Sequence, residues 1–223
     1  MKNRNPLLLK PGRALTWTQA RAGDRKSSAA EATFLIHNEI GFEGGVTSGD
    51  VLTALAEIGS TATIHLQINS PGGLAFHGIA IYNAFRNHKG KVTASVDGAA
   101  GSAASVIAMA ASEITMQRGS IIFIHNAQAL TIGDQHAHKE TAGDLTKISA
   151  DMAEIYSERS GVPLREVQRM MDRETTMSAR EAVAMGFADA LGWEETGTTS
   201  LHKTATMRND RWQRQLARNQ TAI

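Results

Sequence analysis

Apolar positions change their spacing several times along the chain, and these changes predict alternating strands and helices. Continuous or alternating apolar runs favour strands, whereas a spacing of three to four residues favours helices. The predicted strands cover residues 32–40, 64–68, 92–96, 113–116 and 121–124. The predicted helices cover 50–58, 78–88, a small-residue stretch beginning near Ser102, 134–160, 163–171 and a segment opening at Ser178. This alternation predicts an α/β fold with a largely parallel sheet.

The flanking residues lack this pattern. Residues 1–31 and 193–223 are polar and basic, so we predict an N-terminal arm and a C-terminal tail around one domain, 32–192. A mobile arm, a docking segment and a cleavable segment all remain open for 1–31. The tail is expected to be loosely held, with a partner-binding segment as the alternative.

The longest predicted helix carries an apolar stripe that a small domain has difficulty covering. The stripe consists of Leu145, Ile148, Met152, Ile155 and Tyr156. It predicts either core packing or a helix that contacts another subunit, and the pattern leaves both open.

Composition removes several classes of function. The chain has 223 residues, 42% of them hydrophobic, which is enough for one domain with a real core. A net charge of +1 gives no argument for a nucleic-acid partner. The absence of cysteine excludes disulfides, thiolate metal sites and a cysteine nucleophile. No apolar run approaches the roughly 18 residues of a membrane span, so we expect a soluble intracellular protein with no membrane partner.

The first candidate for chemistry is Ser102, in the small-residue stretch 97–112. It is predicted to lie where a strand turns into a helix, and the free N–H groups of a helix start favour developing negative charge there. Such a position suits a nucleophile, although a helix cap in a close-packed Ala/Gly helix is the alternative. The turn 69–73 also places two glycines after a strand, where their N–H groups, with that of Ala103, would form an oxyanion hole. A plain turn is the alternative.

A general base and its orienting group are the remaining parts of such a site. His125 ends the predicted strand 121–124, which would fix its backbone and expose its ring. A structural histidine is the alternative, and His77 is the nearest rival. Asp172 and Glu174 are candidates for the carboxylate that orients the imidazole, or are ordinary solvated acids.

Four motifs in this order resemble the proteolytic subunit family of the Clp proteases (ClpP), and most of all its phage and prophage members. They are INSPGG followed by AIYNAF, GAAGSAAS, IIFIH and MSAREAVAMGFAD, within about residues 32–192. The resemblance implies a ClpP/crotonase-like fold of repeated β-β-α units with a protruding long-helix handle.

The resemblance also assigns roles to residues. It implies Ser102 as nucleophile, His125 as base and Glu174 as the acidic member, with Asp172 open as a substitute. It places the oxyanion donors on the backbone of Gly72 and Ala103. The edge that pairs with the substrate backbone is Gly73, Leu74, Ala75 and Phe76.

Three departures from the family pattern stand out. Glu174 replaces the usual Asp, Ala103 and Ala104 replace Met and Gly, and residues 1–31 hold no counterpart of the axial segment of housekeeping members. The first changes the reach of the carboxylate, and the second changes the pocket. The third weakens the implication of docking to an ATP-driven unfoldase.

The implied activity is peptide-bond hydrolysis through an acyl-enzyme, with no metal and no organic cofactor. The implied assembly is a homo-oligomeric ring, commonly two stacked heptamers joined through the helix near 140–160. The leading interpretation is a phage or prophage protease that processes capsid or scaffold proteins, in the host cytoplasm or the prohead. The alternatives are the peptidase chamber of an ATP-dependent Clp-type protease, a catalytically inactive structural ring, and an acyl-CoA enzyme of the crotonase type.

Overall fold

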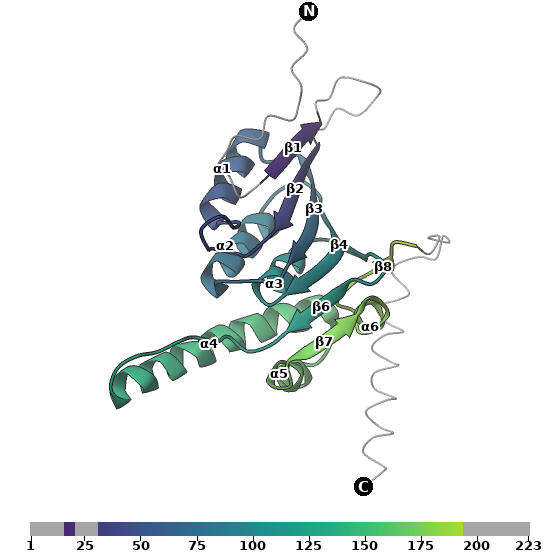
Figure 1. Cartoon of the computed structure of the whole chain (residues 1–223). Helices are drawn as coiled ribbons and strands as arrows, with labels where there is room; N and C mark the ends of the chain where they lie inside the picture. Colours follow the sequence, from purple (N-terminus) through teal and green to yellow (C-terminus); the bar gives the residue numbers. More distant parts are fainter. Residues whose placement is uncertain (1–15, 21–30, 194–223) are drawn as a thin grey trace, which may run out of the picture. The chain divides into compact units, whose positions relative to one another are not determined.

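The computed structural model describes residues 16–20 and 31–193. The described chain forms two compact units that divide after Ile114. Strands and helices alternate through both, which confirms the predicted α/β fold (Figure 1). No helix of the described part is long and apolar enough to cross a membrane.

The first unit is built on four neighbouring strands. Their order is β1, β2, β3, β4; β1 runs antiparallel to β2, and β2, β3 and β4 are parallel. The parallel strands are joined by helical crossovers, as parallel pairing requires. The elements are β1 Thr16–Ala20, β2 Glu31–His37, α1 Ser48–Ile58, β3 Thr63–Ser70, α2 Ala75–Arg86, β4 Val92–Gly101 and α3 Ala103–Ala108.

Helices α1, α2 and α3 lie on one face of this sheet (Figure 1). Every second residue is buried in β2, in β3 and in β4 as far as Val96, so a period of two supplies one apolar face. Every residue of α3 is buried as well. At Gly78 a Cβ would lie 2.8 Å from the Cβ of Ala103, so glycine lets α2 approach α3 closely. This packing fixes the start of α3, immediately after Ser102.

The second unit contains two strand pairs and three helices. The antiparallel pair is β6 with β7, and the parallel pair is β5 with β8. Tyr156 and Phe187 pack against each other in its core, with ring centroids 5.9 Å apart. The elements are β5 Glu113–Met116, β6 Ile121–Ile124, α4 Gln135–Ser160, α5 Leu164–Asp172, β7 Thr175–Ser178, α6 Ala179–Ala184 and β8 Ala190–Leu191.

Helix α4 extends well past the other elements of its unit (Figure 1). It begins at the cap Asp134 and ends at Gly161, which adopts the left-handed conformation with φ 74°. Its buried residues, Met152, Ala153 and Tyr156, all lie in its last third. The predicted apolar stripe is therefore core at one end and half-buried at Leu145 and Ile148, farther along the helix.

The structure differs from the predicted elements in several places, of which β1, β4 and β7 are the clearest. Strand β1 lies within the residues predicted as an arm, because backbone pairing with β2 holds it in place. Strand β7 was not predicted, and β4 runs on through residues expected to form a turn. Most of the predicted arm and the tail from residue 194 lie outside the described residues.

Candidate functional site

Ser102 occupies a sharp junction between β4 and α3. Its backbone has φ 49° and ψ −122°, in a region that residues with a side chain seldom adopt. Strand β4 ends at Gly101 and α3 begins at Ala103, so no linker separates the two elements. Ser102 is half-buried, whereas every residue of α3 is buried. The junction therefore presents one hydroxyl from an otherwise closed segment.

The glycine turn lies directly against this serine, as the sequence predicted. A Cβ on Gly72 would lie 2.7 Å from the Cβ of Ser102 and 3.0 Å from the backbone nitrogen of Ala103. The φ of Gly72 is 106°, which also favours glycine. A side chain at this position would therefore displace the serine.

Hydrogen bonds within the protein determine which backbone groups of the glycine turn are left for a substrate. The Gly72 N–H donates to Ser70 Oγ at 3.1 Å, and that hydroxyl donates to the Asn38 carbonyl at 2.5 Å. The Ile40 N–H donates to the Gly72 carbonyl, and the Leu74 N–H donates to the Ile40 carbonyl. These two hydrogen bonds form a parallel β-bridge between Ile40 and Gly73. In such a bridge the N–H and C=O of Gly73 itself point away from Ile40. Gly73 thus presents an open backbone edge.

The predicted substrate edge is shorter in the structure. Leu74 is extended and is the N-cap of α2, and the Gly78 N–H donates to its carbonyl at 3.1 Å. Ala75 and Phe76 consequently form the first turn of the helix and cannot continue a strand. The extended backbone is limited to Gly73 and Leu74.

The rival histidine has a structural partner. His77 Nδ1 accepts a hydrogen bond from the Ser48 N–H at 3.2 Å, which ties α2 to the start of α1. Its imidazole is thereby used in packing two helices together.

His125 follows β6 directly, as predicted. Its ring stacks on Phe123, with centroids 5.0 Å apart and an interplanar angle of 19°. Its Nδ1 is buried and has no hydrogen-bond partner among the described residues. A buried ring nitrogen without a partner is costly, so this atom is where an orienting group would act.

Neither candidate carboxylate bonds His125 in this structure. Asp172 accepts from Asn126 Nδ2 at 2.8 Å, and Glu174 accepts from Gln128 Nε2 at 3.2 Å. The β6–β7 register pairs Ile124 with Thr175, so the next pair in sequence is His125 with Glu174. Glu174 is therefore adjacent to the imidazole in register while its side chain bonds elsewhere.

Positive φ angles outside glycine fall on two residues that the sequence analysis proposed for the site. In the described part of the chain, the residues other than glycine with positive φ are Asn38, Ser102 and Glu174. Ser102 and Glu174 were predicted as site residues, and Asn38 holds the hydroxyl that binds Gly72. Sequence reasoning missed Asn38 and Ser70; the signal available was Asn, which tolerates the left-handed region better than most residues.

Comparison with known proteins gives one consistent result. The Clp protease family model matches residues 33–195. An ATP-dependent Clp protease proteolytic subunit of Pleurastrum terricola is 34% identical over 148 residues, covering 65% of this chain and 75% of that protein. The subunit of the same name from Chlorella vulgaris is 33% identical over 140 residues, covering 61% of this chain and 69% of that protein. This chain therefore belongs to the Clp protease family of serine-type peptidases.

Proposed function

We propose that this chain is the peptidase subunit of an ATP-dependent Clp-type protease, with Ser102 as its nucleophile. The observation that carries the proposal is the strained backbone of Ser102 at the junction of β4 and α3, with Gly72 packed against it. Strain of this kind persists where a function requires it, because the surrounding structure must offset its cost. The names of the two relatives support an ATP-dependent protease. No observation favours a role in the processing of capsid proteins.

The proposed reaction is acyl transfer to Ser102. His125 takes the proton of the Ser102 hydroxyl as the oxygen attacks the carbonyl carbon of a peptide bond. The same proton then passes to the leaving amine, so the C–N bond breaks and an ester remains. Water, deprotonated by His125, attacks the ester and releases the carboxylic acid, which restores the serine.

The oxyanion of each tetrahedral intermediate needs fixed N–H donors. The Ala103 N–H lies in the first turn of α3, where backbone donors have no partner within the helix. The second donor comes from the turn of Gly72 and Gly73. Because the Gly72 N–H already donates to Ser70, Gly73 offers the unengaged one. Losing one such donor typically costs about 3 kcal/mol of transition-state stabilisation.

The substrate is proposed to be an extended polypeptide. The open N–H and C=O of Gly73 would pair with its main chain, as in strand addition to a sheet edge. Recognition of this kind depends on backbone atoms, which all peptides share. An unfolded chain would therefore be a better substrate than a folded protein.

Active-site labelling tests the nucleophile. A fluorophosphonate should form one adduct on Ser102, read by intact mass and peptide mapping. Ser102→Ala should lose both the adduct and peptidase activity while assembling normally. The matched control is Ser112→Ala, at an exposed serine just after α3, which should label like the wild type. A folded, assembled wild type that takes no label would overturn the proposal.

The ATPase partner is tested separately. Addition of a Clp-type ATPase with ATP should make a stably folded protein degradable, while cleavage of unfolded chains needs no ATPase. Cleavage of unfolded chains with no stimulation by such an ATPase would reject the partner and keep the peptidase.

A further inference from the structure

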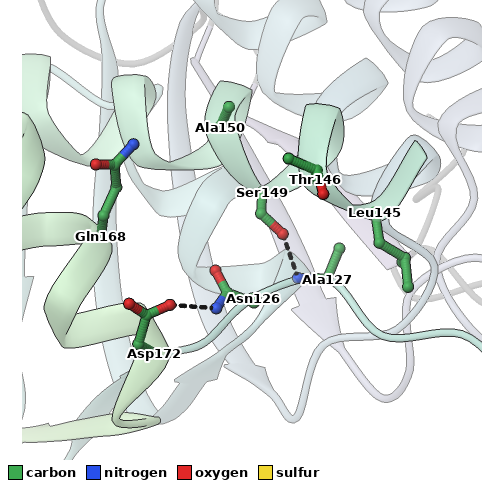
Figure 2. A pocket seen from close by; sticks show the side chains of 8 residues that line it. All are labelled: Asn126, Ala127, Leu145, Thr146, Ser149, Ala150, Gln168 and Asp172. Atoms are coloured by element: carbon green, nitrogen blue, oxygen red, sulfur yellow. Dashed lines mark hydrogen bonds between the residues drawn. The ribbon is translucent and has the colours of Figure 1, made fainter. Parts of the chain in front are cut away.

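A pocket of about 450 Å³ lies within the second unit, lined in part by Asn126 and Ala127, the residues that follow His125 (Figure 2). One wall is the chain just after β6, and the other walls are one face of α4 and the last turns of α5. The lining residues are Asn126, Ala127, Leu145, Thr146, Ser149, Ala150, Gln168 and Asp172. Most of these side chains are polar, which is unusual for a pocket that would take an apolar side chain.

Hydrogen bonds hold the walls of the pocket together (Figure 2). Asn126 Nδ2 donates to Asp172 Oδ1 at 2.8 Å, and the Ala127 N–H donates to Ser149 Oγ at 3.0 Å. These two bonds tie the segment after His125 to α5 and to α4. The pocket is thus built before any ligand enters it.

Several oxygens of the lining residues remain available as acceptors, beside the donors that Ser149 and Gln168 supply. Asn126 uses its amide N–H on Asp172, so its carbonyl oxygen stays available. Thr146 donates its hydroxyl proton to the Ala142 carbonyl at 2.8 Å, which leaves its oxygen as an acceptor. The carboxylate of Asp172 adds further acceptors and a negative charge.

No cation among the described residues lines the pocket to offset that charge. Arg169 on α5 and Arg173 just after it both pair with Glu166. On α4, Lys147 pairs with Asp144 at 3.0 Å. The pocket therefore favours an occupant that is positively charged and donates several hydrogen bonds.

We propose that this pocket selects a lysine or arginine side chain of the polypeptide substrate on the acyl side of the bond that is cleaved. This inference rests on the proposed function, because His125 must reach the Ser102 hydroxyl as that oxygen attacks the carbonyl carbon of the same residue. Asn126 is the direct neighbour of His125, about 3.8 Å away between Cα atoms. A side chain in the pocket consequently belongs to a residue flanking the cleaved bond.

The test compares activated serine reagents that differ only in one side chain. Peptidyl diphenyl phosphonates with lysine, leucine or glutamate next to phosphorus should react with Ser102 at different rates. We expect lysine to react about tenfold faster than glutamate and several-fold faster than leucine, since a partly exposed charge pair typically changes affinity by about fivefold. The small fluorophosphonate, which has no such side chain, is the reference.

Charge variants at the rim assign the preference to this pocket. Gln168 is exposed on α5, so substitutions there leave the core intact. Gln168→Glu should raise the lysine-to-glutamate ratio about fivefold, Gln168→Lys should lower it by a similar factor, and Gln168→Ala should leave it nearly unchanged. Thr146→Glu, from the opposite wall, should act like Gln168→Glu.

The possible results distinguish a failure of the pocket's proposed role from a failure of the proposed peptidase activity. Equal rates for the three phosphonates, with normal fluorophosphonate labelling, would overturn the pocket's role and keep the peptidase. A lysine preference that the charge variants leave unmoved would also overturn it. Failure of every reagent to label Ser102 would overturn both.

Discussion

Two acidic residues, Asp172 and Glu174, compete for one role at the imidazole, and their surroundings separate them. Asp172 ends α5, bonds Asn126 and lines the pocket. Glu174 stands next in register to His125, with a strained φ of 51° and a weak bond to Gln128 at 3.2 Å. The Nδ1 of His125 is buried and has no partner among the described residues. We therefore propose Glu174 for the orienting role.

This assignment predicts unequal effects of two isosteric substitutions. Glu174→Gln should lower kcat by about 10²–10⁴-fold, because an amide does not stabilise the imidazolium that forms during proton transfer. Asp172→Asn should change kcat far less and act through substrate preference. Steady-state kinetics on an unfolded protein, with pH–rate profiles, measure both. A larger loss of kcat in Asp172→Asn would exchange the two roles.

Residue types at the site were predictable, but their backbone conformations were not. The motifs located Ser102, His125 and the Gly72 turn, because glycine and small residues at fixed spacing carry a strong local signal. The positive φ of Ser102 and Glu174 depends on packing by distant segments, as the contact of Gly72 with Ser102 illustrates. The Ser70–Asn38 bond joins residues that are 32 positions apart, so no local pattern could indicate it.

Among the elements, α6 shows how a short helix is held at its start. Ser178 Oγ caps the Glu181 N–H, and the Glu181 carboxylate accepts from the Ser178 N–H at 2.9 Å and its hydroxyl at 2.6 Å. The two residues thus form a capping box at the start of the helix. The hydrogen bond from the Ser178 side chain, and then that from its backbone, lower the pKa of Glu181 from its usual 4.5.

The lowered pKa of Glu181 gives a stability difference with a definite sign. A carboxyl whose folded-state pKa is depressed stabilises the fold above its unfolded pKa, and that contribution is lost as the pH falls through the folded value. Wild type should therefore be more stable than Glu181→Gln at neutral pH. This difference in stability between wild type and the variant should disappear as the pH falls below about 4.5. Denaturation midpoints across this range measure it; a difference that widens on acidification would contradict the cap.

Elements with strong local signals were predicted and those fixed by distant partners were missed. Helices α4 and α6 have caps that can be read in the sequence, Asp134 with Gly161 and Ser178 with Glu181. Strand β7 is only four residues long and exists through its pairing with β6. Strand β1 likewise depends on β2, so residues 16–20 were predicted as part of an arm and not as a strand.

At the scale of the whole molecule, the segment before α4 leaves apolar side chains uncovered. Leu130 is 92% exposed and Ile132 is 89% exposed. The adjoining helix buries no residue before Met152. Two bare side chains beside an unburied helix are costly in water, and contact with another copy of the chain would remove that cost. We therefore propose this region as a contact between copies of the chain.

Charge on these side chains should disrupt that contact. Leu130→Asp combined with Ile132→Asp should reduce the assembled mass measured by light scattering, without unfolding the subunit. The matched control is Thr131→Asp, which adds a charge to the same segment without removing an apolar side chain. Unchanged mass in the double variant would place the contact elsewhere.

The strained conformation of Ser102 also has an evolutionary consequence. Glycine adopts a positive φ without the penalty of about 1 kcal/mol or more that a side chain incurs. With Ser102 as the proposed nucleophile, selection for catalysis would keep serine at this position against that penalty. A descendant that no longer needs to cleave peptides would gain stability by exchanging it for glycine. Glycine at this junction, rather than an arbitrary residue, would then mark the members of a lineage that retained the architecture after losing its chemistry.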